Sequence, residues 1–114
     1  MNLREKQWLF ASLVPVLITY MCMKGYKPVF GYAYRDEETQ KRLVETGASK
    51  TQNSNHLRCL ALDVELFDSE GNYLTKTSDH EQFGEYWESL HPLCRWGGRF
   101  SDGNHYSIEH DGVV

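Results

Sequence analysis

Two histidines and two aspartates occur in two short stretches that lie far apart in the chain. The stretch "SNHLRCLALD", from Ser54 to Asp63, contains His56, and the stretch "DGNH" places Asp102 three residues before His105. Two imidazoles and one carboxylate make a three-ligand catalytic zinc site with a fourth position open for water, and a second carboxylate can accept a proton from that water. The four residues therefore indicate metal-assisted hydrolysis. Their spacing alone is also consistent with structural roles, such as a strand aspartate that caps a loop.

The spacing within the first stretch constrains the backbone between its two polar residues. Alternate residues of a strand share a face, so His56 and Asp63, seven residues apart, would face opposite ways in a regular strand. We therefore expect a bend or turn within "LRCL" if both side chains bind one ion. Cys59 of that stretch is an alternative ligand, but its thiolate would fill the position that water needs.

Caps and hydrophobic periodicity predict elements in the order α-β-α-β-β-α-β. They are a helix from the Asn2 cap to Met23 that Pro15 bends or divides, a strand in "KPVFGYAY", a helix between Asp36 and Gly47, strands in "CLALDVELF" and "YLTKT", a helix in "SDHEQFGEYWESL", and a short strand that ends the glycine-rich "RWGGRFSDGNHYSIEH". This order predicts an α+β fold with a small, mainly antiparallel sheet flanked by helices. The first helix is expected to be a buried core helix, and His80 to be solvated.

Length and charge limit the function classes. With 114 residues, the chain is expected to form one domain over residues 1–114. A net charge of −4 gives no support for nucleic-acid binding. The longest apolar run is too short for a comfortable membrane span, contains Pro15, and is followed by no signal-peptide cleavage site. Three cysteines without zinc-like spacing indicate reduced thiols in a cytosolic compartment.

Three segments together resemble one enzyme family. "SNHLRCLALD" resembles the S-x-H-x-x-G-x-A-x-D signature of the zinc D-Ala-D-Ala carboxypeptidases and L-alanyl-D-glutamate endopeptidases, which include vancomycin-resistance dipeptidases and many phage endolysins. "GYAYRDEETQKRL" is similar to the family's upstream segment, in which an arginine ends a strand and a glutamine follows five residues later. "WGGRFSDGNHY" is similar to its terminal segment, in which an acidic residue precedes the last metal histidine by three. The segments occur in the family's order from Tyr32 to Tyr106.

The resemblance implies a zinc site and a general base. By this resemblance His56, Asp63 and His105 are the Zn²⁺ ligands. Asp102 is the base that takes a proton from the attacking water and passes it to the leaving amine. The implied fold is that of the Hedgehog and DD-peptidase domains.

The resemblance also implies a set of residues around the substrate. Arg35 is expected to bind a substrate carboxylate or to steady the oxyanion, because a guanidinium offers fixed, charged donors. Gln40 and Ser54 match positions that line the substrate cleft. Cys59 departs from the pattern, since the signature has glycine there, and a cysteine fits only if the backbone angle is ordinary.

The function implied by the resemblance is that of a zinc metallopeptidase that hydrolyses peptidoglycan stem peptides. The small size and the "GASKTQNSNH" approach to the motif favour an L-alanyl-D-glutamate endopeptidase of the endolysin type. A D-alanyl-D-alanine carboxypeptidase and a non-catalytic metal-binding module with the same fold are the alternatives; a redox role for Cys59 lacks a C-x-x-C motif. The protein is expected to be a monomer without a signal peptide that accumulates in the host cytoplasm before it reaches the cell wall.

Overall fold

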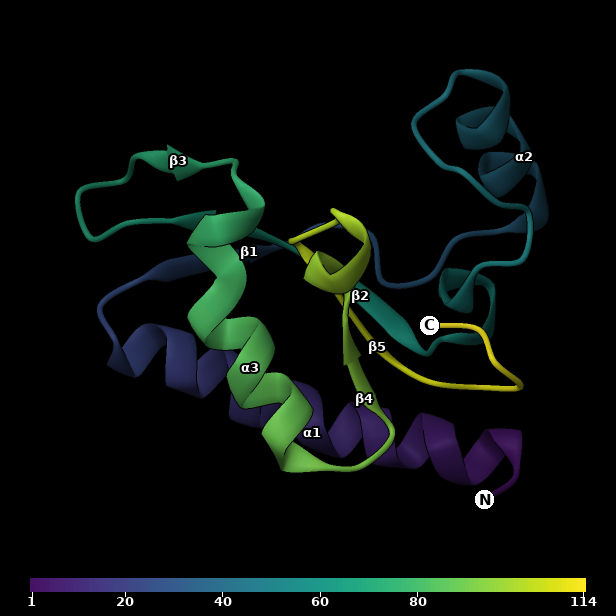
Figure 1. Cartoon of the computed structure of the whole chain (residues 1–114), viewed down its shortest axis with the longest axis horizontal. Coiled ribbons are helices and arrows are strands. Elements are labelled where there is room, and N and C mark those ends of the chain that lie inside the picture. The colour runs from purple at the N-terminus through teal and green to yellow at the C-terminus, as the bar shows by residue number, and fades with distance from the viewer.

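One antiparallel sheet organises the chain (Figure 1). A computed structural model describes all residues, Met1–Val114. The elements in chain order are α1 (Leu3–Met23), β1 (Lys27–Phe30), α2 (Glu37–Glu45), the 3₁₀ turn η1 (Asn55–Arg58), β2 (Ala61–Phe67), β3 (Tyr73–Leu74), the 3₁₀ turn η2 (Thr77–His80), α3 (Glu81–Leu90), β4 (Cys94–Trp96), the 3₁₀ turn η3 (Gly97–Phe100) and β5 (His105–Ile108). The five strands pair in the order β1-β2-β5-β4, with β3 also paired to β2. The predicted α+β class with an antiparallel sheet is therefore confirmed, and the elements that the sequence did not predict are the three-residue strand β4 and the three 3₁₀ turns.

The two faces of the sheet differ in chemistry because β2 alternates. Leu62, Val64 and Leu66 point into the core, whereas Asp63 and Glu65 lie on the opposite face. The core packs α1 and α3 against the sheet through one cluster: Phe10, Leu17, Met21, Leu60, Leu62, Val64, Leu66, Phe83, Trp87, Cys94, Trp96, Tyr106 and Ile108. The polar face is therefore free to carry a site, while the apolar face supports the strands beneath it.

Helix α1 starts as the sequence predicts and packs by one side only. The Asn2 and Glu5 side chains form the reciprocal cap, and the helix runs through Pro15 without being divided. Although Phe10 and its neighbours along one side are buried, Trp8 is 66% exposed, so the expected buried core helix is correct for one side only. By length and apolar composition α1 could also cross a membrane, a test that a core helix passes equally.

His80 is buried, not solvated, and that expectation is wrong. The turn η2 places the imidazole against β5, where its Nδ1 lies 2.8 Å from the Tyr106 hydroxyl oxygen. The sequence places His80 at a helix start, where histidines are usually exposed; its burial depends on the tertiary packing of η2 on the sheet.

Candidate metal centre

The register of β2 and β5 places two of the expected ligands side by side. Asp63 and His105 are direct partners in this antiparallel pair, and directly opposed residues project to the same face. His105 Nδ1 lies 3.5 Å from Asp63 Oδ1. Strand pairing alone therefore brings together a carboxylate and an imidazole that are far apart in the sequence.

The third expected ligand reaches the same point from the turn η1. The Ser54 side chain caps this turn by accepting a hydrogen bond from the His56 backbone N–H, and the turn ends at Cys59 in the left-handed region, with φ 57°. This change of direction aims His56 back over the strand, and its Nε2 lies 3.2 Å from Asp63 Oδ1. The bend expected within "LRCL" is confirmed. The expectation that a cysteine fits here only with an ordinary backbone angle is wrong, because Cys59 occupies the left-handed region.

Cys59 stands where the signature that this segment resembles has glycine, and its left-handed conformation is one that glycine adopts more easily. A side chain in the left-handed region brings its Cβ close to the following carbonyl oxygen, a contact that glycine avoids. The thiol is exposed and lines an apolar groove beside α1, outside the group of potential metal ligands. The alternative of a mixed His/Cys site therefore has no support in the geometry.

The donor atoms fit a divalent metal ion. His56 Nδ1 lies 3.1 Å from the Ala33 carbonyl oxygen, which only accepts hydrogen bonds, so Nδ1 carries a proton and Nε2, which faces Asp63, is the nitrogen that would bind a metal ion. That Nε2 is buried without a hydrogen-bond partner. Ligand atoms of His56, Asp63 and His105 all lie within 4.8 Å of one another, and tetrahedral zinc sets its ligand atoms about 3.3–3.6 Å apart. When His56 Nε2 carries no proton, it and Asp63 Oδ1 are two acceptors 3.2 Å apart, and a cation bound between them would stabilise the pair.

Asp63 has the ionisation state that a ligand needs. Burial alone would raise its pKa, but the adjacent ring nitrogens of His105 and His56 outweigh burial and hold the pKa of this carboxyl well below its usual range. The carboxylate is therefore ionised over the physiological pH range, as metal binding requires.

Arg35 holds the other oxygen of the same carboxylate. Its Nη2 donates to Asp63 Oδ2 at 3.0 Å, and its guanidinium lies over the Tyr32 ring, 4.4 Å from the ring centroid. With one carboxylate oxygen bound by arginine, the other is left to face the two imidazoles. Arg35 thus orients a potential ligand, and its expected contact with substrate stays a prediction.

Gln40 is fully buried beside Arg35. Its Oε1 accepts a hydrogen bond from Arg35 Nη1 at 3.1 Å, and its Nε2 donates to the Thr51 carbonyl and the Ser49 hydroxyl. Gln40 therefore joins α2 to the loop at one side of the site. Substrate contacts by Gln40, and by Ser54 in its capping position, stay predictions.

Asp102 borders the three-residue group without belonging to it. Its Oδ2 lies 4.0 Å from His105 Nδ1, and its side chain is 52% exposed. The partial burial, and secondarily the negative charge of Asp63, raise the pKa of Asp102, while His105 opposes the shift. The turn that carries Asp102 needs Gly97, because a Cβ there would lie 2.2 Å from the Asp102 carbonyl oxygen.

The group opens into a cleft of about 500 Å³. Arg35, Ser54, His56, Asp63, Asp102 and His105 all line this cleft. It also has polar and aromatic lining residues that the sequence analysis missed, among them Lys50, Asn53, Phe100 and Asn104. Most of these residues lie in loops and turns away from the proposed ligands in the sequence. Asn104 is the exception, because it precedes His105 directly in "DGNH", and this position could have indicated that it lines the site.

Known proteins resemble this chain in structure but not detectably in overall sequence. No model of a known protein family matches the chain, and no curated protein matches it in sequence. Among solved structures, the L-Ala D-Glu endopeptidase ChiX of Serratia marcescens matches 72% of this chain with a TM-score of 0.62 and 22% sequence identity. The chain shares the fold of this endopeptidase. It covers 66% of the length of the ChiX chain, and at this identity the likeness shows the fold alone.

Proposed function

We propose that this protein is a zinc-dependent peptidase that hydrolyses the L-alanyl-D-glutamate bond of peptidoglycan stem peptides. The observation that carries the proposal is the convergence of three side chains on one point of an open cleft: His56, Asp63 and His105. Asp102, a carboxylate that does not belong to the group, stands 4.0 Å from one of them. The fold shared with an L-Ala D-Glu endopeptidase supports the same reading.

The donor set suits zinc. Two imidazole nitrogens and one carboxylate oxygen are a ligand set found in catalytic zinc sites, and the site has the hydrogen bonds that orient such ligands: Ala33 fixes His56, and Arg35 fixes Asp63. When bound, zinc would supply Lewis-acid polarisation of the scissile carbonyl and of water.

Asp102 is the proton carrier of the proposed reaction. As the water oxygen bonds to the carbonyl carbon, the Asp102 carboxylate accepts the water proton; when the C–N bond breaks, it returns that proton to the leaving amine nitrogen. A carboxyl group with a raised pKa holds the proton better between the two steps. Its half-exposed position lets it reach both the water and the amine.

Arg35 supplies fixed positive charge at the cleft. Its bond to Asp63 keeps this carboxylate oriented, and the same charge favours the negative oxygen that develops during attack. The planar guanidinium of Arg35 contacts Asp63 with one nitrogen and Gln40 with another. A lysine lacks this fork and could not make both contacts in the same geometry.

The bond that is cut can be identified from the products. Purified peptidoglycan is digested with the zinc-loaded protein and the released fragments are analysed by mass spectrometry. New N-terminal D-glutamate is expected; free D-alanine would identify a D-alanyl-D-alanine carboxypeptidase instead. The absence of any released fragment, with zinc bound, would contradict the proposal and leave the non-catalytic metal-binding module.

The resemblance of three sequence segments to a peptidase family that includes phage endolysins also suggests a cellular setting. We propose an endolysin-type monomer that is held in the host cytoplasm until the membrane is permeabilised. Fractionation of expressing cells, before and after permeabilisation, tests this: the protein is expected in the cytoplasmic fraction first, and detection in the wall of intact cells would contradict it.

A further inference from the structure

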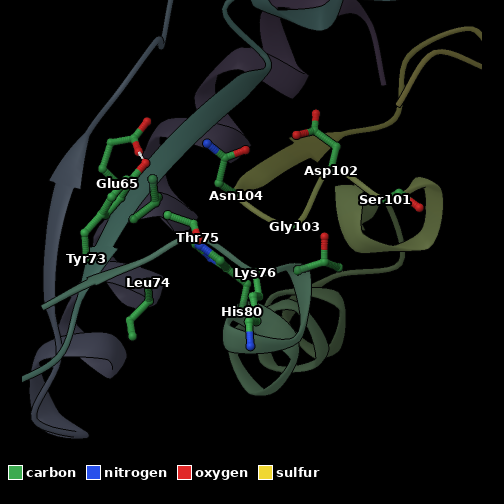
Figure 2. Close-up of a pocket in the computed structure, with 12 residues that line it drawn as sticks. Glu65, Tyr73, Leu74, Thr75, Lys76, His80, Ser101, Asp102, Gly103 and Asn104 are labelled. Atoms are coloured by element: carbon green, nitrogen blue, oxygen red, sulfur yellow. Dashed lines mark hydrogen bonds between the residues drawn. The ribbon is translucent and has the colours of Figure 1, made fainter.

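A second pocket adjoins the cleft along the segment that carries the proposed base. It has a volume of about 190 Å³, and only three of its twelve lining residues are hydrophobic. It shares Ser101, Asp102 and Asn104 with the larger cleft. In Figure 2 Asp102 and Ser101 lie on one side of this pocket and Glu65 and Tyr73 on the other. A substrate bound beside Asp102 can therefore extend from the cleft into this pocket.

Glu65 gives the pocket a negative charge that is held in place. It follows Asp63 by two residues on β2, so both carboxylates are on the same face of the sheet. The Tyr73 hydroxyl donates a hydrogen bond to Glu65 Oε2. Room for the other oxygen depends on Gly31, since a Cβ there would lie 3.1 Å from Glu65 Oε1. The carboxylate is thus oriented and keeps acceptor capacity.

Lys76 gives the same pocket a positive charge. Its side chain lines the pocket, and its ammonium forms no ion pair with any carboxylate of the chain. Lys76 and Glu65 therefore present opposite charges to one hollow without neutralising each other. A ligand with a complementary pair of charges can satisfy both.

Apart from Asp102, the remaining walls are neutral and closely packed. Burial lowers the pKa of His80, so its imidazole adds no charge near neutral pH. Gly103 lets the turn η2 approach closely, because a Cβ there would lie 2.5 Å from Thr77 Cα. The pocket is therefore formed by packed backbone segments, and Glu65 and Lys76 supply its charges away from Asp102.

We propose that this pocket binds a substrate side chain that ends in both an ammonium and a carboxylate group. Glu65 contacts the ammonium and Lys76 the carboxylate. The inference rests on the proposed function, within which it names the stem-peptide class: stems that contain a diamino dicarboxylic acid carry this ending, and stems that contain lysine carry the ammonium alone.

Three synthetic stem peptides test the proposal. They differ only in the third residue, which is a diamino dicarboxylic acid, lysine or Nε-acetyllysine, and kcat and KM are measured with the zinc-loaded full chain. We expect kcat/KM to fall about tenfold at each step, mainly through KM, because each step removes one charge-assisted contact.

Two variants assign the two contacts. Glu65→Gln should remove the preference for lysine over Nε-acetyllysine while it keeps an acceptor for Tyr73, and Lys76→Gln should remove the preference for the diamino dicarboxylic acid over lysine. Glu70→Gln and Lys27→Gln make the same charge changes at exposed positions outside both pockets and should keep both preferences. Circular dichroism verifies that each variant is folded.

Binding measurements separate this inference from the proposed function. Calorimetric Kd values of the same peptides on the zinc-loaded Asp102→Asn variant, in which turnover is suppressed, should follow the same order. Ordered Kd values, with no cleavage by the unsubstituted protein, would refute the peptidase and keep the pocket. Equal values for the three peptides, or preferences that survive in both pocket variants, would overturn the pocket assignment whether or not cleavage occurs.

Discussion

The candidate centre is built by two kinds of local structure. Asp63 and His105 lie on paired strands, where the register fixes their separation over a buried core. His56 lies in the 3₁₀ turn η1, and Asp102 follows the 3₁₀ turn η3. Half of the site therefore depends on the sheet as a whole, and the other half on short segments of backbone.

The two turns share a feature that the strands lack. Each ends at a non-glycine residue in the left-handed region: Cys59, with φ 57°, after η1, and Ser101, with φ 63°, after η3. Such residues persist only where the surrounding structure holds them. The turns therefore carry strain next to the chemistry, whereas the sheet supplies the rigid base, and substitutions in the two regions should have different effects.

The largest expected effect is on catalysis at the turn region. Asp102→Asn should lower kcat roughly 10²–10⁴-fold, because the water loses its proton acceptor. Zinc content should not change, since Asp102 lies outside the three-ligand group. Hydrolysis rates and metal analysis on the same sample check both statements, with Asp111→Asn, at an exposed position in the tail, as control. Undiminished turnover would remove Asp102 from the reaction.

The next effect concerns the sheet region and the support of its carboxylate. Arg35→Lys should weaken zinc binding roughly 10–100-fold, because a supporting residue that orients a ligand typically contributes this much. Competition with a chromophoric chelator measures the affinity, and Arg42→Lys, on the exposed side of α2, is the matched control. Equal affinities of the two variants would show that Asp63 needs no such support.

A smaller effect is expected where the two regions are joined. Asn55 is fully buried, and its Nδ2 donates to the carbonyls of Ile108 and Val113, which ties η1 to the end of β5. Asn55→Ala should lower the free energy of unfolding by about 1–3 kcal/mol, because the buried Ile108 carbonyl and the part-buried Val113 carbonyl each lose a donor. Urea denaturation measures it against Asn53→Ala, an exposed neighbour. A loss of unfolding free energy no larger than that of Asn53→Ala would mean that the Asn55 hydrogen bonds do not hold η1 to the end of β5.

The smallest effect tests the strain itself. Cys59→Gly should raise the free energy of unfolding by about 1 kcal/mol, because glycine adopts the left-handed conformation without steric cost. Cys59→Ala is the matched control, since it removes the thiol and keeps the Cβ, and it should bring no such gain. Equal stabilities of the two variants would mean that the turn is not strained at Cys59.

The sequence predicted the sheet region better than the turn region, for a physical reason. Alternation in β2 separates Leu62 and Val64 from Asp63, so the face of the sheet that carries the carboxylate follows from the pattern. Which residue pairs opposite Asp63 depends on the register, and periodicity does not encode it. The ligand set came from a resemblance in three segments, and the structure brings those side chains together.

Other parts of the site depend on backbone groups and on tertiary packing, which the pattern of polar and apolar side chains in the sequence does not reveal. The acceptor that fixes the His56 tautomer is the backbone carbonyl of Ala33. The burial of His80 and the pocket around Glu65 arise from the packing of η2 against the sheet. These features are tertiary, so one sequence could not predict them.

Zinc content and peptidoglycan hydrolysis, followed on the same sample through chelation and zinc return, show whether the three side chains hold a catalytic zinc ion. We predict about one zinc per chain, loss of hydrolysis when the zinc is removed, and recovery when it is restored, because His56, Asp63 and His105 together form one site. Hydrolysis that continues after complete removal of the metal would contradict the account.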